Sequence, residues 1–258
     1  MHRLFLRLMA MALPATLLAC APPAPTRSIP RSAVPGQAAR QMALQRVAAV
    51  VISDRASLPN RNGSVLDMAH AAEDTDGGSA TPITQDGYFL TADHVLAQSA
   101  GRHVFVLYGT GSHRRTAKAR IVWRTLKGDL ALLHAPISTP AHYAWTPASE
   151  WLPAGTPVIH GGVSTGFRTQ PGKLTSDLSP QGPFTGIRAF KIDMPLQPGD
   201  SGGPVLDATG RLIGVNSAVE FLVPMETAFF IDSEGNRPNL GKIQAIIDRD
   251  RAGSAGQP

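Results

Sequence analysis

The sequence predicts an all-β fold, an antiparallel sandwich or barrel, with one helix at the C-terminal end. Three observations lead to this prediction: short apolar segments recur at even spacing from residue 77 onward, turn residues separate them, and the 258 residues include 25 glycines and 22 prolines. Many short, evenly spaced strands are typical of antiparallel sheets. The chain is long enough for one large domain or for two small barrels that share an interface.

The N-terminal segment has the features of an export signal. Arg3 and Arg7 precede an apolar run that ends at residue 19 and is too short to span a bilayer as a helix. Cys20, the only cysteine in the chain, follows the residues Leu-Leu-Ala, and this context resembles the lipobox of bacterial lipoproteins. We expect a signal peptide at 1–19 and a lipid on Cys20, which would anchor the exported protein to a membrane of the bacterial cell envelope. A plain secretory signal with a chance cysteine is the alternative.

The next segments lead into the first apolar strand. Residues 20–40 are rich in proline and alanine, which predicts an extended tether because this composition cannot pack a core. A short helix is expected at 37–46 and a strand at 47–52. Residues 53–76 are polar and rich in turn formers, so we expect a long surface loop with a short helix near 65–72.

The predicted strands fall into two groups. Those of the first group are 79–84, 88–92, 104–108, 117–123 and 130–134, and those of the second are 157–160, 173–177, 187–192, 203–207, 211–217 and 228–232. The residues Gln-Asp-Gly at 85–87 predict a hairpin between the first two strands. A connector at 136–153 with four prolines separates the groups.

This division gives the expected organisation of the chain. The first unit spans 41–146, and the second spans 147–251 and ends in an amphipathic helix at 239–251. Residues 252–258 are expected to form a disordered tail.

Charge and histidine spacing exclude two classes of function. The net charge is +5, and two of the arginines lie in the expected signal peptide, so the mature chain has only a modest basic excess. No lysine run or interleaving of basic and aromatic residues indicates nucleic-acid binding, and the basic residues at 114–124 alternate as on a solvated sheet edge. No metal or other cofactor is expected, because the remaining histidines lack paired ligand spacing: His70, His103, His113, His134, His142 and His160.

Residues 198–204, Pro-Gly-Asp-Ser-Gly-Gly-Pro, place Ser201 in a turn with three glycines. A serine hydroxyl reacts only if a base removes its proton and donors stabilise the resulting oxyanion. Glycines let a substrate carbonyl approach the backbone closely, so the N–H groups of Gly199 and Ser201 are the candidate oxyanion hole. The alternative is an ordinary hairpin loop.

Two upstream residues could assist Ser201. His94 follows directly after the strand predicted at 88–92 and could act as the base, and Asp129 precedes the strand at 130–134 and could orient it. A solvated histidine and an aspartate that caps a turn are the alternative interpretations.

Three motifs together carry a family resemblance. Leu-Thr-Ala-Asp-His-Val, Gly-Asp-Leu-Ala-Leu-Leu and Gly-Asp-Ser-Gly-Gly-Pro-Val contain His94, Asp129 and Ser201 in an order that resembles the chymotrypsin-like serine proteases. The surroundings of Ser201 look most similar to bacterial HtrA-type (Deg) proteases, although no PDZ domain is expected here. The resemblance implies two antiparallel β-barrels and a serine endopeptidase acting on a protein or peptide substrate, with His94 as base, Asp129 as orienting acid and Ser201 as acylated nucleophile. It implies no oligomeric state.

The chain departs from this family pattern at two acids. In secreted digestive enzymes, the residue matching Asp200 pairs with an N-terminal amine made by zymogen cleavage, but no Ile-Val-Gly-Gly segment exists here. We expect backbone N–H groups or an arginine to hold Asp200 instead. Asp93, beside His94, is expected to favour the imidazolium form.

The resemblance also implies a primary pocket. Its base would be Pro195 and its wall Ser217, Ala218 and Val219, so no acid is present to bind lysine or arginine. We expect cleavage after small or medium aliphatic residues, because a β-branched Val219 would narrow the pocket.

Two other functions remain open at this point. One is a catalytically silent protease-fold lipoprotein that acts as a binding or scaffold module. The other keeps the acyl-enzyme but uses it for ester hydrolysis or transfer.

Overall fold

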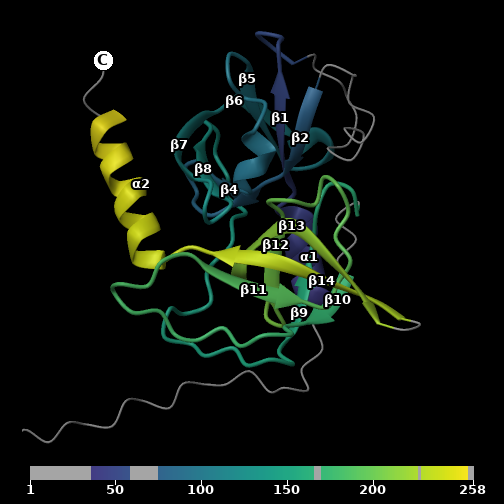
Figure 1. Ribbon diagram of the computed structural model, residues 1–258. Helices are drawn as coiled ribbons and strands as arrows, with labels where there is room; N and C mark the ends of the chain where they lie inside the picture. The colour runs from purple at the N-terminus through teal and green to yellow at the C-terminus, as the bar shows by residue number, and fades with distance from the viewer. Residues whose placement is uncertain (1–35, 59–74, 166–169, 226–227, 255–258) are drawn as a thin grey trace, which may run out of the picture.

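The computed structural model describes residues 36–58, 75–165, 170–225 and 228–254, with only the backbone described at 75, 170, 218–225 and 228–232. The expected signal peptide, Cys20, the start of the tether and the short helix near 65–72 lie outside the described residues. Two β-rich halves are stacked on each other, with a helix at each end of the described chain (Figure 1). Among the described helices, none is long and apolar enough to cross a membrane.

The first half consists of two four-stranded antiparallel sheets, ordered β2-β1-β5-β6 and β3-β4-β8-β7. Its strands are β1 (Ala48–Ser53), β2 (Thr75–Ser79), β3 (Thr81–Pro82), β4 (Tyr88–Thr91), β5 (His103–Tyr108), β6 (Arg115–Lys118), β7 (Arg120–Thr125) and β8 (Leu130–His134). β1 is buried on both faces: Val50 and Ile52 pack with Phe89 and Leu133 inside the barrel, whereas Val51 packs outside it. This burial on both faces explains why β1, in the interior of its sheet, is apolar at nearly every position.

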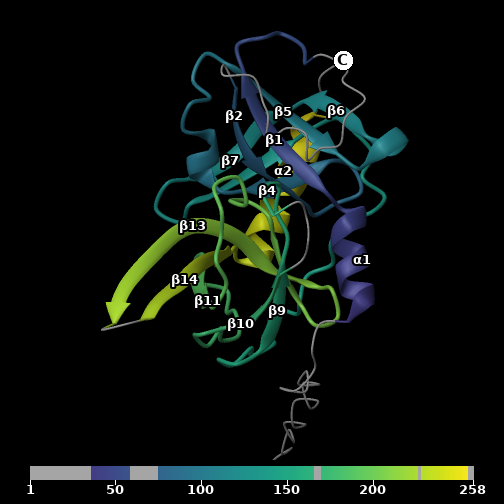
Figure 2. The ribbon, with the colours of Figure 1, turned by 90° about the vertical axis from the view of Figure 1, so that its right-hand side faces the viewer.

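The second half is one six-stranded antiparallel sheet, ordered β10-β9-β12-β13-β14-β11. Its strands are β9 (Pro157–His160), β10 (Gln170–Lys173), β11 (Arg188–Ile192), β12 (Pro204–Asp207), β13 (Leu212–Met225) and β14 (Ala228–Arg237). Phe190 fills the core because Gly214 and Gly235 face its ring; a Cβ on either would lie within 2.6 Å of a ring atom. Figure 2 shows β13 and β14 extending from this half as a two-stranded ribbon. The predicted fold of two antiparallel β-barrels is confirmed.

One apolar cluster joins the two halves. Leu90 and Leu130 of the first half pack with Leu206 of the second half, and the helices α1 (Gln37–Gln45) and α2 (Leu240–Ser254) add residues to the same cluster. Ile243 and Ile247 are the buried side chains of α2. The relative position of the barrels is therefore set by packing.

Helix α2 follows the second half but is also bonded to the first. Asp250 accepts a hydrogen bond of 2.7 Å from the Tyr88 hydroxyl and one of 2.6 Å from Arg120, and Arg251 donates to Asp86 at 2.8 Å. Figure 1 shows α2 beside β7 and β8. The helix thereby connects the two barrels.

The structure corrects several expected boundaries. The strand predicted at 117–123 is two strands in different sheets, because β6 ends at Lys118 and β7 begins at Arg120. A bulge between Ile121 and Trp123 then interrupts the alternation, and Ile121 is exposed. β13 and β14 are longer than expected, β10 lies a few residues earlier, and α2 continues to Ser254, beyond the expected start of the tail at 252.

Candidate active site

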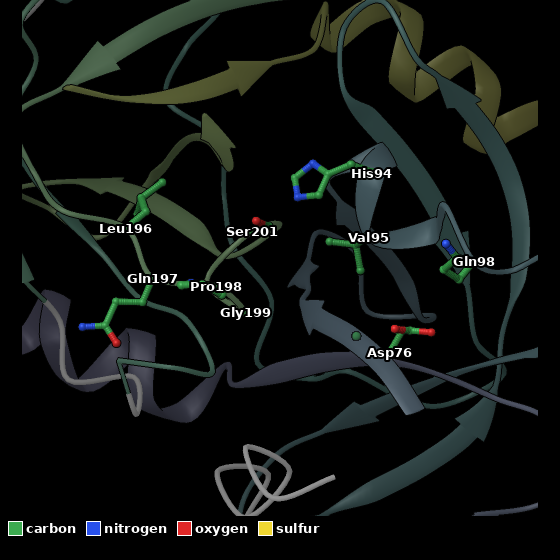
Figure 3. A pocket seen from close by; sticks show the side chains of 10 residues that line it. Asp76, His94, Val95, Gln98, Leu196, Gln197, Pro198, Gly199 and Ser201 are labelled. Carbon is green, nitrogen blue, oxygen red and sulfur yellow. The ribbon is translucent and has the colours of Figure 1, made fainter. Parts of the chain in front are cut away.

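His94 and Ser201 face one cavity between the barrels. His94 lies in a short 3₁₀ helix (Asp93–Leu96) directly after β4, and Ser201 lies in the turn before β12. Figure 3 shows the His94 ring directed toward the Ser201 side chain. Among the described residues, no hydrogen bond joins these two side chains. Such bonds are often long in ligand-free enzymes and shorten when substrate binds.

Asp129 orients the His94 ring, and it does so from the turn before β8. His94 Nδ1 lies 2.8 Å from Asp129 Oδ2 and 3.0 Å from Oδ1, and the His94 backbone N–H donates to Oδ1 at 2.9 Å. With the Nδ1 proton directed at the carboxylate, His94 Nε2 is left to accept a proton. Asp129 has a φ of 38°, a sparsely populated conformation for a residue other than glycine.

Ser217 is a third donor to Asp129. It is fully buried, and its hydroxyl donates to Asp129 Oδ2. Sequence reasoning assigned Ser217 to the wall of the substrate pocket and missed this contact. The Ser217 hydroxyl is therefore bonded to Asp129.

The hydrogen bonds set the charge states of this pair. Burial alone would raise the pKa of Asp129, but hydrogen bonds from His94 and Ser217 outweigh it and bring the pKa to about 2. The hydrogen bond to Asp129 raises the pKa of His94, burial opposes the rise, and the charges of Asp129 and then Asp93 add to it. The direction expected for Asp93 is therefore confirmed, although Asp129 is the larger cause.

Asp93 itself is buried and forms an ion pair with Arg124. The Arg124 guanidinium donates to both Asp93 oxygens, at 2.6 and 2.9 Å. Arg124 was expected on a solvated sheet edge, but the bulge in β7 brings it to the buried acid.

We expect peptide hydrolysis by this chain to rise with pH as His94 loses its proton, with a midpoint above 6.5, because Asp129 and Asp93 stabilise the imidazolium. Asp93→Asn should move the midpoint to lower pH, since one of these charges is removed while Arg124 remains. The double variant Asp93→Asn/Arg124→Gln should move it less. Profiles of kcat/KM against pH would measure both shifts, and a midpoint that moved upward in Asp93→Asn would contradict this assignment.

Asp200 is held by backbone N–H groups, which is one of the two alternatives expected from the sequence. Its buried Oδ1 accepts hydrogen bonds of 3.1 Å from Ser164 N and Thr165 N, and Oδ2 accepts one of 3.1 Å from Gln197 N. Gly162 makes room for it, because a Cβ there would lie 2.2 Å from Oδ1. No arginine contacts Asp200 in the part of the chain that the structure describes.

The two expected oxyanion donors are not bonded to another described group of the protein. Within the described ranges, no acceptor bonds the N–H of Gly199 or of Ser201. Gly199 and Gly202 have φ values of 100° and 84°, which other residues rarely adopt, so both glycines are needed for this turn.

Residues of the first barrel hold the glycine-rich turn of the second barrel that contains Ser201. Ser79 donates through its N–H to Ser201 O at 2.9 Å and through Oγ to Gly199 O at 2.7 Å, and Thr81 Oγ1 donates to Gly202 O at 2.8 Å. Sequence reasoning missed these residues; their only signal is a hydroxyl within a short buried strand segment.

The cavity beside His94 and Ser201 has a volume of about 460 Å³. It is lined by Asp76, Gly77, His94, Val95, Gln98, Leu196, Gln197, Pro198, Gly199 and Ser201. Pro195 is exposed, and its buried neighbour Leu196 lines this cavity instead. The side chains of Ala218 and Val219 lie outside the described residues. The described histidine and acidic side chains form no group of three that could hold a metal ion.

Comparison with known proteins identifies the class. Residues 78–215, more than half of the chain, match the sequence family described as the trypsin-like peptidase domain. The chain therefore belongs to the trypsin-like peptidase family.

The chain is also similar to curated proteins at lower coverage of their length. The chain is similar to proteins named probable periplasmic serine endoprotease DegP-like, from Pseudomonas fluorescens (27% identity over 207 residues, 69% of this chain and 40% of the relative) and from Halomonas elongata (27% over 217 residues, 73% and 42%). The chain thus spans about two fifths of the length of these relatives.

Solved structures share the fold. The HtrA-type protease AlgW with decapeptide superposes with a TM-score of 0.54 and 20% identity, covering 82% of this chain and 67% of AlgW. The serine endoprotease from Yersinia pestis gives 0.50 and 17%, covering 81% and 65%. At these identities, the comparison bears on the fold alone.

Proposed function

We propose that this protein is a serine endopeptidase of the bacterial envelope that hydrolyses peptide bonds with His94, Asp129 and Ser201. The observation that carries the proposal is the 2.8 Å contact between His94 Nδ1 and Asp129 Oδ2, in a ring that faces the same cavity as Ser201. Two unpaired N–H groups at Gly199 and Ser201 complete the requirements of acyl transfer.

The proposed reaction begins with attack of Ser201 Oγ on the substrate carbonyl carbon, while His94 Nε2 accepts the hydroxyl proton. The carbonyl oxygen becomes an oxyanion that accepts hydrogen bonds from Gly199 N–H and Ser201 N–H. Asp129 stabilises the imidazolium, which then donates its proton to the leaving amine as the peptide C–N bond breaks. Water, deprotonated by His94, attacks the acyl-enzyme, and the proton returns to Ser201 as the new carboxyl product leaves.

An envelope location is supported by the N-terminal sequence and by the relatives, which are named as periplasmic. We propose export through the signal at 1–19 and lipid attachment at Cys20. Metabolic labelling with a radioactive fatty acid tests the anchor: the wild-type chain should be labelled and the Cys20→Ser variant should not.

We further propose that the enzyme cleaves after small or medium aliphatic residues. Pro195 provides no acid, and the neighbouring side chain that lines the cavity is the apolar Leu196. A library of peptides that differ at the residue before the scissile bond should be cleaved mainly after alanine, valine or leucine. Cleavage mainly after arginine or phenylalanine would contradict this preference.

Fluorophosphonate labelling of the purified mature protein tests the catalytic assignment. The probe phosphonylates a serine only where nucleophile, base and oxyanion donors act together. The expected result is one label per chain on Ser201, and none on Ser201→Ala. A correctly folded chain that takes no label would instead support the silent binding or scaffold module, and a labelled chain that cleaves ester but not peptide substrates would support ester hydrolysis.

A further inference from the structure

We infer that Ser164 is a positioning residue that keeps the oxyanion hole open; this inference rests on the proposed function. Ser164 lies in the loop after β9, next to the nucleophile turn. Its hydroxyl donates to the carbonyl oxygen of Pro198, and its N–H donates to Asp200 Oδ1 at 3.1 Å. The same residue therefore contacts two successive parts of the turn that presents Ser201.

The orientation of the Gly199 N–H follows from the contact with Pro198. The Pro198–Gly199 peptide is trans, as are all described peptides, so its C=O and N–H point in opposite directions. When Ser164 holds the C=O on its own side, the Gly199 N–H must point away from Ser164, toward the cavity that both Gly199 and Ser201 line. The hydroxyl thus acts on an oxyanion donor without touching the substrate.

Each of the next two peptides of the turn is held in a comparable way. The Gly199 carbonyl accepts from Ser79 Oγ at 2.7 Å, and the following N–H, of Asp200, donates to Gln197 O at 2.9 Å. The Asp200 carbonyl accepts from Gly203 N at 2.9 Å, which directs the Ser201 N–H to the opposite side. Ser164 supplies the equivalent contact for the preceding peptide, Pro198–Gly199.

Gly199 makes the Pro198–Gly199 peptide easy to rotate. Its φ is 100°, and a half-turn of the peptide would bring φ to about −80°, which glycine adopts just as readily. The Pro198 carbonyl would then point into the cavity and the Gly199 N–H out of it. Backbone preference alone does not oppose this rotation, so a hydrogen bond must.

No other group performs the function of the Ser164 hydroxyl. Among the described residues, no second donor bonds the Pro198 carbonyl. The Asp200 carboxylate accepts from the backbone N–H groups of Ser164, Thr165 and Gln197, and none of these bonds holds the Pro198 carbonyl. The fit is close, because a Cβ on Gly199 would lie 2.4 Å from Ser164 Oγ. Gly199 therefore both permits the rotation and admits the hydroxyl that prevents it.

The test compares Ser164→Ala with Ser164→Thr, which keeps a hydroxyl, and with Ser138→Ala, an exposed serine remote from the site. For a peptide substrate, Ser164→Ala should lower kcat about 10- to 100-fold with little change in KM, because the loss of one oxyanion donor costs ~10²–10³ and the rotated peptide is only partly populated. Ser164→Thr should recover most of the rate, and Ser138→Ala should match the parent.

A pair of inhibitors separates positioning from general disruption. A peptide aldehyde forms an oxyanion in the site, whereas the same peptide with a reduced CH₂–NH bond cannot. Ser164→Ala should lower the affinity for the aldehyde by the same factor by which it lowers kcat. It should leave the affinity for the reduced-bond peptide unchanged. Unchanged kcat in Ser164→Ala, equal weakening of both inhibitors, or no recovery in Ser164→Thr would overturn the inference. A parent chain without hydrolysis or fluorophosphonate labelling would refute the proposed function itself, which is a distinct result.

Discussion

Replacing Ser201 by alanine is expected to lower kcat for peptide hydrolysis by about 10⁶-fold, because the acyl-enzyme can no longer form. The fold should be unaffected. The hydroxyl makes no hydrogen bond to another described residue, and the contact that holds this part of the turn, from Ser79 N to Ser201 O at 2.9 Å, uses only the backbone. Progress curves with a fluorogenic peptide measure the rate, and the thermal unfolding midpoint reports the fold.

The matched control for Ser201→Ala is Ser138→Ala, which removes an exposed hydroxyl and should leave kcat and the midpoint at the parental values. Hydrolysis of casein by Ser201→Ala at the parental rate would show that another residue is the nucleophile. A loss of rate accompanied by a large fall in the midpoint would show that Ser201 acts mainly in folding.

Asp129→Asn is expected to lower kcat/KM by about 10⁴-fold. The carboxylate accepts from His94 Nδ1, from the His94 N–H and from the Ser217 hydroxyl, and this pattern keeps the imidazole proton on Nδ1. An asparagine amide can donate to Nδ1 instead, which moves the proton to Nε2 and removes the base. Because Asp129 is also the main cause of the raised His94 pKa, the midpoint of any residual activity should move to lower pH.

Asp86→Asn provides the control for Asp129→Asn. Asp86 is also a carboxylate with strong hydrogen bonds, from Arg251 at 2.8 Å, but it lies at the surface outside the cavity. Its replacement should change kcat/KM by less than about twofold, since exposed ion pairs contribute little. If Asp129→Asn kept its rate within tenfold of the parent, the orientation of His94 would have to depend on other groups.

The sequence predicted those residues of the site that lie in a recognisable local motif. His94 follows a strand, Asp129 begins one, and Ser201 lies among glycines, so each was recognisable from its local motif. The need for a new partner for Asp200 could also be inferred, since the amine-generating segment was missing and backbone N–H groups were an available substitute.

The remaining parts depend on contacts between distant segments. Ser79 and Gly199 are 120 residues apart, and Ser217 and Asp129 are 88 apart, so no local pattern indicates that these groups meet. A buried hydroxyl in a strand has many possible acceptors, and only the packing of two barrels selects one. The change of sheet between Lys118 and Arg120 and the bulge in β7 are not visible for a similar reason: alternation identifies a strand, but it does not locate the points where the pairing of that strand changes.

The division of the site between two barrels has a consequence for the chain during its own synthesis. The proposed acid and base belong to the first barrel, whereas the turn that carries the proposed nucleophile belongs to the second and is bonded to the first through Ser79 and Thr81. Helix α2, made after both barrels, is bonded back to the first. A chain emerging N-terminal end first carries half of the machinery before it carries the rest. The proposed site is therefore complete only when both barrels have folded and packed against each other.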